Sequence, residues 1–255
     1  MTLPKKYEVT ANVVQQQKLI ETVYFLMVYA PAIAQAAEPG QFVQLRILRG
    51  AFTLRRPLGV AAIDRENGNI AFIYRVVGEG TRALAALQKD DSVNVLGPLG
   101  NGFSHDFVHP LVVGGGIGLS PLLYYAASLK GRADVLMGGR TEDELFWNTL
   151  FHGFVRNIFI TTDDGSLGVR GFATDLLPTL LARYDYDGIV VCGPEVMMRG
   201  VAKLAQEHGT PCEVSLEARM ACGLGACLSC SVDTRGGRRK VCKDGPVFSA
   251  AEVFS

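Results

Sequence analysis

The stretch LVVGGGIGLSPLL, Leu111 to Leu123, begins as an apolar, β-branched run and passes through glycines into a helix-forming segment. Its glycines follow the pattern G-x-G-x-x-P, with Gly116, Gly118 and Pro121 in the defining places. Glycines let a backbone approach a pyrophosphate closely, and proline suits a first helical turn. We interpret the stretch as the first turn of a dinucleotide-binding sheet, although a purely structural tight turn also needs glycine.

Outward from this turn, apolar runs alternate with helix-forming segments as far as residue 208. Alternation of this kind predicts a doubly wound sheet of parallel strands with helices on both faces. Strands are expected at 111–116, 133–139, 157–163 and 188–193, and helices at 120–130, 141–151, 171–184 and 195–208.

The first hundred residues have a different pattern, in which short β-branched and aromatic runs are separated by Gly, Pro and Asn turns. This pattern predicts a small antiparallel β-barrel, with a strand and a turn at 22–34 and one helix at 81–88 capped by Thr81. The glycines of GPLGNGF, Gly97 to Phe103, mark a boundary. We therefore expect three parts: a β-barrel domain at 1–100, an α/β domain at 101–211 and a small C-terminal unit at 212–255.

Composition excludes several classes of function. The chain has 255 residues, of which 48% are apolar, and 25 basic side chains balance 25 acidic ones. A balanced charge argues against a nucleic-acid binder, because phosphate affinity depends on clustered Lys and Arg. The polar start predicts no secretory signal, and the longest apolar segment is too short to span a membrane. We expect a cytoplasmic protein without a membrane or nucleic-acid partner.

Four of the six cysteines are grouped as C-x4-C-x2-C-x11-C, at Cys222, Cys227, Cys230 and Cys242. The first steps match the spacing of plant-type [2Fe-2S] sites, and small residues between them leave room for inorganic sulfide. The segment 231–242 reads as a hairpin that turns at Gly236-Gly237 and returns Cys242 beside Cys230. Four thiolates also suit zinc, but zinc sites more often come as two separated C-x2-C pairs. Disulfides are disfavoured in a reducing compartment.

The basic residues at the tip of this hairpin, Arg235, Arg238, Arg239 and Lys240, are interpreted as a solvated surface rather than a partner contact. The remaining cysteines stand alone, and ordinary packing is the default interpretation for both. Cys192 also follows a predicted strand, at the edge of the sheet where ligands of such folds bind, and is a candidate for contact with nicotinamide.

Two segments of the predicted barrel suit a second dinucleotide. Pro57 favours an extended Arg56 in LRRPLG, and a forked guanidinium suits a pyrophosphate. In IYRVVGEGT, Gly80 and Thr81 lead into the predicted helix, which favours anion binding at its start. On the other domain, Arg140 ends the second strand, where a ribose-binding carboxylate is expected, so the sequence leaves NAD and NADP open.

Taken together, LRRPLG, IYRVVGEGT, GPLGNGF, VGGGIGLSP, CGPEVMM and SLEARMACGLGACLSC resemble the electron-transfer subunits of the NAD-linked, heteromeric dihydroorotate dehydrogenases, within the ferredoxin-reductase superfamily. The resemblance implies FAD, NAD and a [2Fe-2S] cluster held by the four grouped cysteines. It places flavin contacts on Arg56, Pro57, Leu58, Gly59, Ile73, Tyr74, Arg75, Gly80 and Thr81. Gly59 departs from the serine usual in the family, which removes a hydroxyl hydrogen bond to the flavin.

The resemblance further implies a role in pyrimidine biosynthesis. A separate FMN-containing catalytic subunit would oxidise dihydroorotate and pass electrons to this chain, in a complex with two copies of each subunit. No acid or base of this chain is then needed for the oxidation. Two alternatives stay open. One is the flavin and iron-sulfur subunit of another NAD(P)H-linked oxidoreductase, such as a bifurcating NADH-dependent ferredoxin:NADP oxidoreductase, in which an aspartate is expected among the cluster ligands. The other is a zinc-stabilised nucleotide-binding regulatory module.

Overall fold

The computed structural model describes residues 5–48, 50 and 52–254, and the chain divides into two compact units. Unit 1 comprises Met1–Gly102, Glu217–Val232 and Lys240–Pro246, and unit 2 comprises Phe103–Leu216, Asp233–Arg239 and Val247–Ser255. The four grouped cysteines therefore fall in unit 1. The three-part division predicted above stays a prediction. The first four residues, on which the expected lack of a secretory signal depends, lie outside the described residues.

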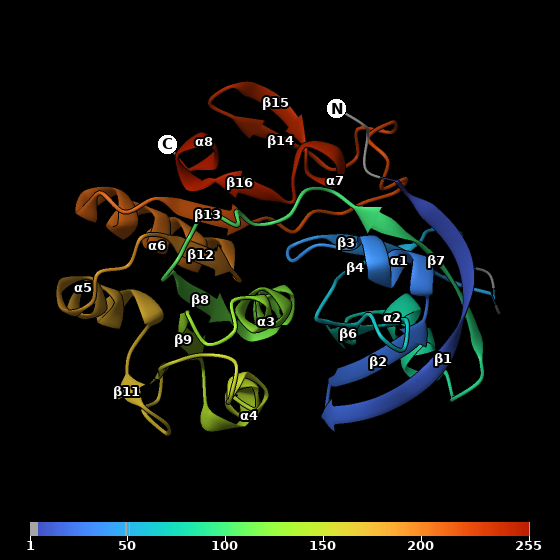
Figure 1. Ribbon diagram of the computed structural model, residues 1–255, viewed down its shortest axis with the longest axis horizontal. Helices are drawn as coiled ribbons and strands as arrows, with labels where there is room; N and C mark the ends of the chain where they lie inside the picture. Colours follow the sequence, from blue (N-terminus) through green and yellow to red (C-terminus); the bar gives the residue numbers. More distant parts are fainter. Residues whose placement is uncertain (1–4, 49, 51, 255) are drawn as a thin grey trace. The chain divides into compact units, whose positions relative to one another are not determined.

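Unit 1 is built on a curved, antiparallel, seven-stranded sheet with the order β4-β3-β7-β1-β2-β6-β5 (Figure 1). This half-barrel confirms the predicted class of the N-terminal part. Its inner face is formed by alternate side chains such as Val43, Leu45 and Phe72, which are fully buried. The strands are β1 (Tyr7–Ile20), β2 (Val23–Tyr29), β3 (Phe42–Ile47), β4 (Arg56–Gly59), β5 (Ala62–Asp64), β6 (Asn69–Arg75) and β7 (Ser92–Leu99).

Two short helices accompany this sheet, and both correct the sequence-based expectations. The segment expected as a turn after β2 forms α1 (Pro31–Ala36), which proline at its first position favours. Helix α2 (Glu79–Ala85) begins two residues earlier than predicted and is capped at Gly78. Thr81 is therefore not the N-cap; its Oγ1 accepts hydrogen bonds from the amides of Val77 and Gly78.

Unit 2 contains a seven-stranded sheet with the order β11-β10-β9-β8-β12-β13-β16, parallel except where β13 meets β16. The predicted doubly wound sheet is confirmed, and the chain reverses its direction of winding between β8 and β12. The strands are β8 (Leu111–Gly115), β9 (Asp134–Gly139), β10 (Ile158–Thr162), β11 (Val169–Arg170), β12 (Ile189–Cys192), β13 (Cys212–Ser215) and β16 (Val247–Ser249).

Helices cover both faces of this sheet. Figure 1 shows α3 (Leu119–Ser128) and α4 (Trp147–Phe151) on one side, and α5 (Ala173–Arg183) and α6 (Glu195–His208) on the other. The helix predicted at 141–151 is interrupted: a 3-10 turn, η2 (Glu142–Glu144), precedes α4 because Leu145 leaves the helical conformation. A last helix, α8 (Ala250–Val253), packs on α6.

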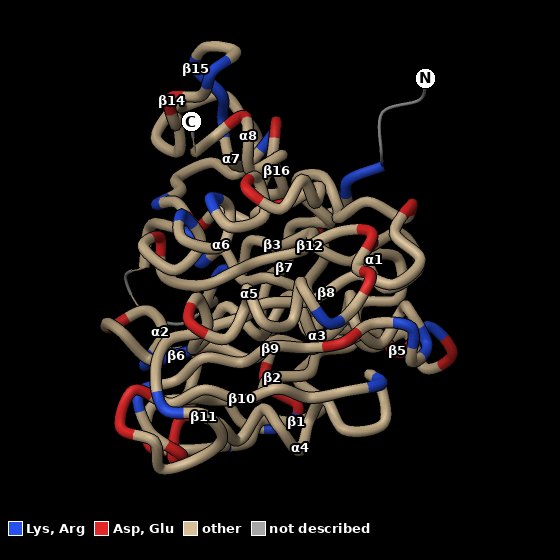
Figure 2. Tube along the Cα trace, turned by 90° about the vertical axis from the view of Figure 1, so that its left-hand side faces the viewer, with Lys and Arg blue, Asp and Glu red and all other residues tan. Residues whose placement is uncertain are grey.

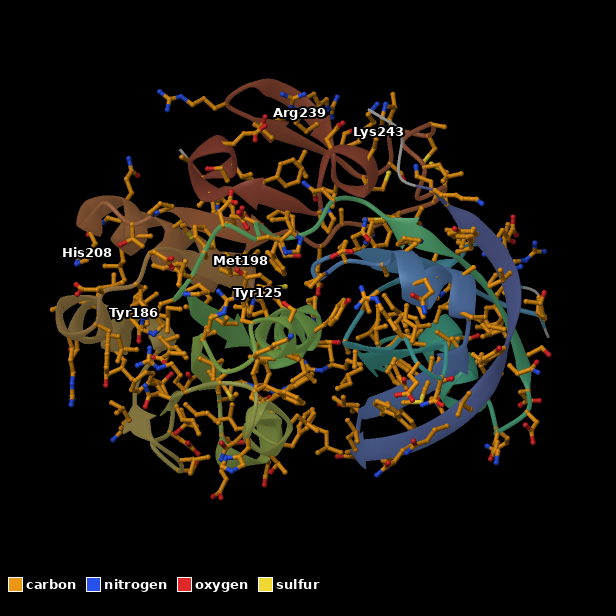
Figure 3. All side chains as sticks on the ribbon, in the orientation of Figure 1. Tyr125, Tyr186, Met198, His208, Arg239 and Lys243 are labelled. Carbon is orange, nitrogen blue, oxygen red and sulfur yellow. The ribbon has the colours of Figure 1, made fainter. Side chains whose placement is uncertain are left out.

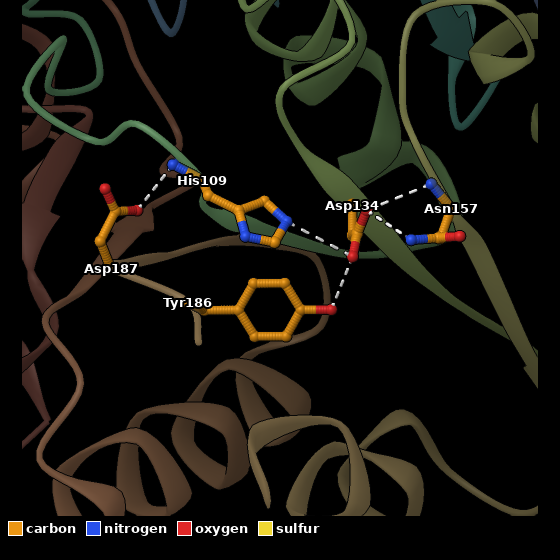
Figure 4. Close-up of polar contacts among 5 residues, drawn as sticks. All are labelled: His109, Asp134, Asn157, Tyr186 and Asp187. Carbon is orange, nitrogen blue, oxygen red and sulfur yellow. Dashed lines mark hydrogen bonds and ion pairs between the residues drawn. The ribbon is translucent and has the colours of Figure 1, made fainter. Parts of the chain in front are cut away.

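A buried carboxylate fastens the amino-terminal ends of these strands (Figure 4). Asp134, which is 0% exposed, accepts hydrogen bonds from the amide and side chain of Asn157 and, over 2.9 Å, from the hydroxyl of Tyr186. His109 Nε2 lies 3.6 Å from the same carboxylate. These residues lie at the sheet edge opposite to the one where ligands of such folds bind, which indicates a structural role.

The predicted hairpin after Cys230 forms, but its two-residue loop lies one residue earlier than predicted. Strands β14 (Ser231–Thr234) and β15 (Gly237–Lys240) enclose the two-residue loop Arg235-Gly236, and Cys242 lies in the short helix α7 (Val241–Asp244). The Lys and Arg residues of this hairpin are blue in Figure 2. Nε of Arg239 lies 3.4 Å from Oε1 of Glu252. Among the described residues, no helix has the length and apolar character needed to cross a bilayer.

Candidate functional site

The loop before β14 and the helix α7 bring the predicted cluster ligands together as two interacting pairs. The thiol of Cys222 interacts with that of Cys227. The amide of Cys242 donates a hydrogen bond to Sγ of Cys230 over 3.5 Å, and the two thiols also interact directly. The thiol of Cys242 also interacts electrostatically with that of Cys222, so the two pairs are neighbours.

Backbone amides of the same loop point at sulfur. The amide of Leu224 donates to Sγ of Cys222 over 3.3 Å, and the amide of Gly225 donates to Sγ of Cys242 over 3.1 Å. Such donors stabilise thiolates and tune any metal that the thiolates bind. The loop therefore provides both ligands and their supporting hydrogen bonds.

The thiols differ in their tendency to ionise. Hydrogen bonds from Ser229, whose Oγ lies 3.2 Å from the Cys227 sulfur, lower the pKa of Cys227 to about 6. Burial, with the neighbouring Cys230 thiol, raises the pKa of Cys242 to about 12. A metal that binds all four sulfurs must therefore displace a proton from the buried pair. Cys212 lies in β13, outside the quartet, and burial raises its pKa to about 12.

Two glycines allow the loop to lie close to its neighbours. Gly223 and Gly225 have φ angles of +70° and +82°, which favour glycine. A Cβ atom on Gly223 would lie 2.7 Å from Nε2 of Gln44, and one on Gly225 would lie 2.9 Å from Cδ of Lys243, which is labelled in Figure 3. The loop is therefore held between these two side chains.

The donor set fits an iron-sulfur cluster. The thiols form two pairs, and a [2Fe-2S] cluster bound by four cysteines has two irons to be held. Small and glycine residues line the loop, as room for bridging sulfide requires.

The two predicted phosphate-binding segments of unit 1 meet at Arg56 and Gly80. A Cβ atom on Gly80 would lie 2.0 Å from Nε of Arg56, so the guanidinium rests directly on the start of α2. Arg56 also donates to the carbonyl of Leu54. Pro57, Leu58 and Gly59 continue β4, which pairs with β3 and is half-buried throughout.

The other predicted flavin residues lie at the end of β6. Ile73 and Tyr74 are buried, and the Tyr74 hydroxyl accepts a hydrogen bond from Gln16 over 3.0 Å. The buried Nε of Arg75 has no hydrogen-bond partner among the described residues. An unpaired guanidinium nitrogen beside these positions suits an acceptor on a bound ligand.

The glycine turn of unit 2 lies at the reversal point of the sheet. After β8, Gly116 adopts a φ of +56° and starts a 3-10 turn, η1 (Gly116–Gly118), that leads into α3. A Cβ atom on Gly118 would lie 2.5 Å from the carbonyl oxygen of Cys192, which ends β12. The structure thus brings Gly116, Gly118 and Cys192 together where open α/β sheets bind ligands.

Glu144 was missed in the sequence, although the spacing of four residues from Arg140 is a signal for an ion pair. Its carboxylate accepts hydrogen bonds from the amide of Arg140 over 3.1 Å and from Nε of Arg140 over 2.8 Å. Hydrogen bonding to Glu144 raises the pKa of Arg140, and Asp163 adds a smaller contribution. The carboxylate of Glu144 therefore lies beside Arg140, just beyond the end of β9.

An antiparallel half-barrel, a doubly wound sheet with a glycine turn and a group of four thiols together define a ferredoxin-reductase-like electron-transfer protein with an iron-sulfur site. Residues 217–254 match the model of the iron-sulfur cluster binding domain of dihydroorotate dehydrogenase B. The chain is 40% identical to the dihydroorotate dehydrogenase B (NAD(+)) electron transfer subunit of Clostridium acetobutylicum, over 85% of this chain and 86% of that protein. The corresponding subunit of Geobacillus thermodenitrificans is 39% identical, over 95% and 96%. The chain belongs to this family of electron transfer subunits.

Solved structures share the fold. The structure of an NADH-dependent reduced ferredoxin-NADP oxidoreductase, described for flavin-based electron bifurcation, has a TM-score of 0.87 and 32% identity, over 96% of this chain and 90% of that one. A ferredoxin NADP+ reductase from Neisseria gonorrhoeae has a TM-score of 0.65 and 15% identity, over 79% and 92%, and shows the shared fold.

Proposed function

We propose that this chain carries electrons from a dihydroorotate-oxidising partner, through a [2Fe-2S] cluster on Cys222, Cys227, Cys230 and Cys242 and an FAD on the half-barrel, to NAD+. The observation that carries the proposal is the meeting of three thiols of the loop before β14 with Cys242 of α7, with backbone amides directed at the sulfurs of Cys222, Cys230 and Cys242. A bound flavin supplies exchange of a hydride with nicotinamide and of single electrons with the cluster.

The residues of unit 1 bind and orient the flavin. Arg56 suits the pyrophosphate, because its guanidinium is forked and already lies against the backbone of Gly80. At Gly59 only the backbone amide is available where the family usually has a serine hydroxyl. The proposed FAD contacts are Arg56, Pro57, Leu58, Gly59, Ile73, Tyr74, Arg75, Gly80 and Thr81.

The residues of unit 2 bind the nicotinamide dinucleotide. Gly116 and Gly118 let the backbone approach the pyrophosphate, and Cys192 lies beside them at the reversal point. Glu144 accepts a hydrogen bond from the guanidinium of Arg140, the group that would otherwise bind a 2′-phosphate. This pairing supports NAD rather than NADP. We retain the division into a FAD domain (1–100), an NAD domain (101–211) and a cluster unit (212–255) as a functional proposal.

The partner is proposed to be an FMN-containing catalytic subunit, in a complex with two copies of each chain, in the cytoplasm. The relatives' name, electron transfer subunit, supports a partner catalytic subunit. The rim of the cluster loop suits a contact, because Cys227 is exposed and two leucines beside it, Leu224 and Leu228, are 44% and 61% exposed.

The likeness to the bifurcating oxidoreductase supports a second candidate, a flavin subunit that exchanges electrons with ferredoxin. The all-cysteine quartet favours the first proposal, because an aspartate is expected among the cluster ligands of that alternative. A zinc-stabilised module would instead be colourless and inert toward NADH.

Reconstitution tests the proposal. The flavin- and cluster-loaded chain is mixed with the FMN subunit, dihydroorotate and NAD+, and NADH formation is followed by absorbance. NADH is expected only when both subunits are present. An intact complex that forms no NADH from dihydroorotate but reduces NAD+ from reduced ferredoxin would favour the second candidate.

A further inference from the structure

Gln44 is a polar residue that is buried in the middle of a strand, and its burial needs an explanation. It lies in the middle of β3, where its neighbours Val43 and Leu45 point into the core of the half-barrel. Because side chains alternate along a strand, Gln44 points to the opposite face. Its side chain is nevertheless 0% exposed. Another segment of unit 1 must therefore cover it.

The covering segment is the cysteine loop. A Cβ atom on Gly223 would lie 2.7 Å from Nε2 and 2.8 Å from Cγ of Gln44, so the carboxamide rests directly against the residue that follows Cys222. In the sheet, Gln44 is the cross-strand partner of Pro57, one of the proposed flavin contacts. Gln44 therefore lies on the strand next to the proposed flavin-binding strand, and its carboxamide contacts the cluster loop.

Neither Oε1 nor Nε2 of Gln44 has a hydrogen-bond partner among the described residues. A buried, unpaired amide destabilises a folded chain, because its hydrogen bonds to water are lost without replacement. The buried glutamine three residues earlier shows the usual arrangement: Gln41 donates to the carbonyl of Gly100 and accepts from the amide of Glu38, each over 2.8 Å.

We propose that the carboxamide of Gln44 donates a hydrogen bond to sulfur of the iron-sulfur site on the Cys222 side and thereby raises its reduction potential, an assignment that rests on the proposed electron-transfer function. Sulfurs of a cluster are acceptors, and hydrogen bonds to them favour the reduced, more negatively charged state.

The Gln44→Met variant tests this role, because methionine keeps the length of the side chain and removes the donor. The potential of the loaded chain is measured by a redox titration followed by electron paramagnetic resonance. Reduction of the cluster is expected to become roughly fivefold less favourable, the effect of one hydrogen bond. The cluster-free variant is expected to unfold at a denaturant concentration no lower than the wild type does, because an unpaired amide has been removed.

Gln41→Met is the matched control. It removes a satisfied buried amide from the same unit, so it should lower stability and leave the potential unchanged. An unchanged potential in Gln44→Met, with normal iron and sulfide content, would overturn the proposal. A shift of equal size in both variants would do the same, because it would reflect general loosening.

The proposal can also be tested on the wild-type chain, so that the result does not depend on whether a variant folds. Chain labelled with ¹⁵N in the glutamine side chains is reduced and studied by pulsed electron paramagnetic resonance. A weak coupling between the cluster and an amide nitrogen is expected, and its loss in Gln44→Met identifies the donor. An intact cluster without such coupling would contradict the proposal about Gln44. Wild-type protein that contains no iron or sulfide would instead contradict the proposed electron-transfer function.

Discussion

At the scale of single residues, the cluster loop depends on Gly223. It combines a left-handed backbone with a close approach to Gln44. Gly223→Ala is expected to lower iron and sulfide content, because the loop must both adopt a strained φ, at about 1 kcal/mol, and move away from Gln44. Metal analysis of purified protein measures the effect.

Gly209→Ala is the control for that experiment. Gly209 has a φ of +78°, but among the described residues no atom beyond its neighbours along the chain lies within 4 Å of its Cβ position. It bears the same backbone strain without the overlap and should retain its iron. Equal loss in both variants would mean that backbone strain alone, and not the contact with Gln44, explains the defect.

Glu144 is expected to set the choice of dinucleotide. Glu144→Gln removes the charge that engages Arg140 and should raise the ratio of kcat/KM for NADPH over NADH by roughly fivefold, as an exposed ion pair allows. The double variant Arg140→Ala/Glu144→Gln should lose this gain. Glu207→Gln, which breaks an exposed pair with Lys203 on α6, is the control and should leave the ratio unchanged.

At the scale of elements, the hydrogen bonds around Asp134 join the ends of the strands in unit 2. Tyr186→Phe removes the 2.9 Å hydrogen bond from the hydroxyl and leaves a buried carboxylate less satisfied. A loss of about 1 to 3 kcal/mol in the free energy of unfolding is expected, measured by chemical denaturation. Reaction with NADH should persist, because the network lies at the opposite edge of the sheet.

The same hydroxyl gives a pH dependence. Burial, with the hydrogen bond to Asp134, raises the pKa of Tyr186 above its ordinary value of 10.0. The folded chain then holds a proton that the unfolded chain releases, so stability falls as the pH rises above 10. Tyr186→Phe should show a shallower decline in denaturation at pH 9 to 11. Parallel curves would contradict this assignment.

The success of prediction from sequence varies with the kind of element. Helix α6 was predicted at its observed bounds because it is long and amphipathic and ends at Gly209 in the left-handed conformation. Helix α1 was missed because a six-residue helix has too little periodicity to show. The hairpin turn was placed one residue late because consecutive glycines, Gly236 and Gly237, suit either register.

The candidate site was predictable where one loop contains it and less so where distant segments meet. Spacing alone grouped the four cysteines. The contact of Arg56 with Gly80, the engagement of Arg140 by Glu144 and the burial of Gln44 under Gly223 depend on tertiary structure. Nothing in the local sequence of Gln44 distinguishes it from a solvated strand residue.

At the scale of the whole molecule, the account separates two electron-transfer steps. Cys227→Ser should abolish NADH formation from dihydroorotate in the complex while reduction of a dye by NADH through the flavin persists. Cys212→Ser, which changes a thiol outside the quartet, should retain both activities. Loss of both activities in Cys227→Ser despite normal flavin content would show that the two steps are not separable.

The central claim is that four thiolates hold a [2Fe-2S] cluster that exchanges electrons with a flavin on the same chain. The most direct test is to purify the chain without oxygen, determine iron, acid-labile sulfide and zinc, and record electron paramagnetic resonance after adding NADH. Equal amounts of iron and sulfide, with the signal of a reduced [2Fe-2S] cluster, are predicted. A chain that contains zinc in place of iron and gives no signal would contradict the account.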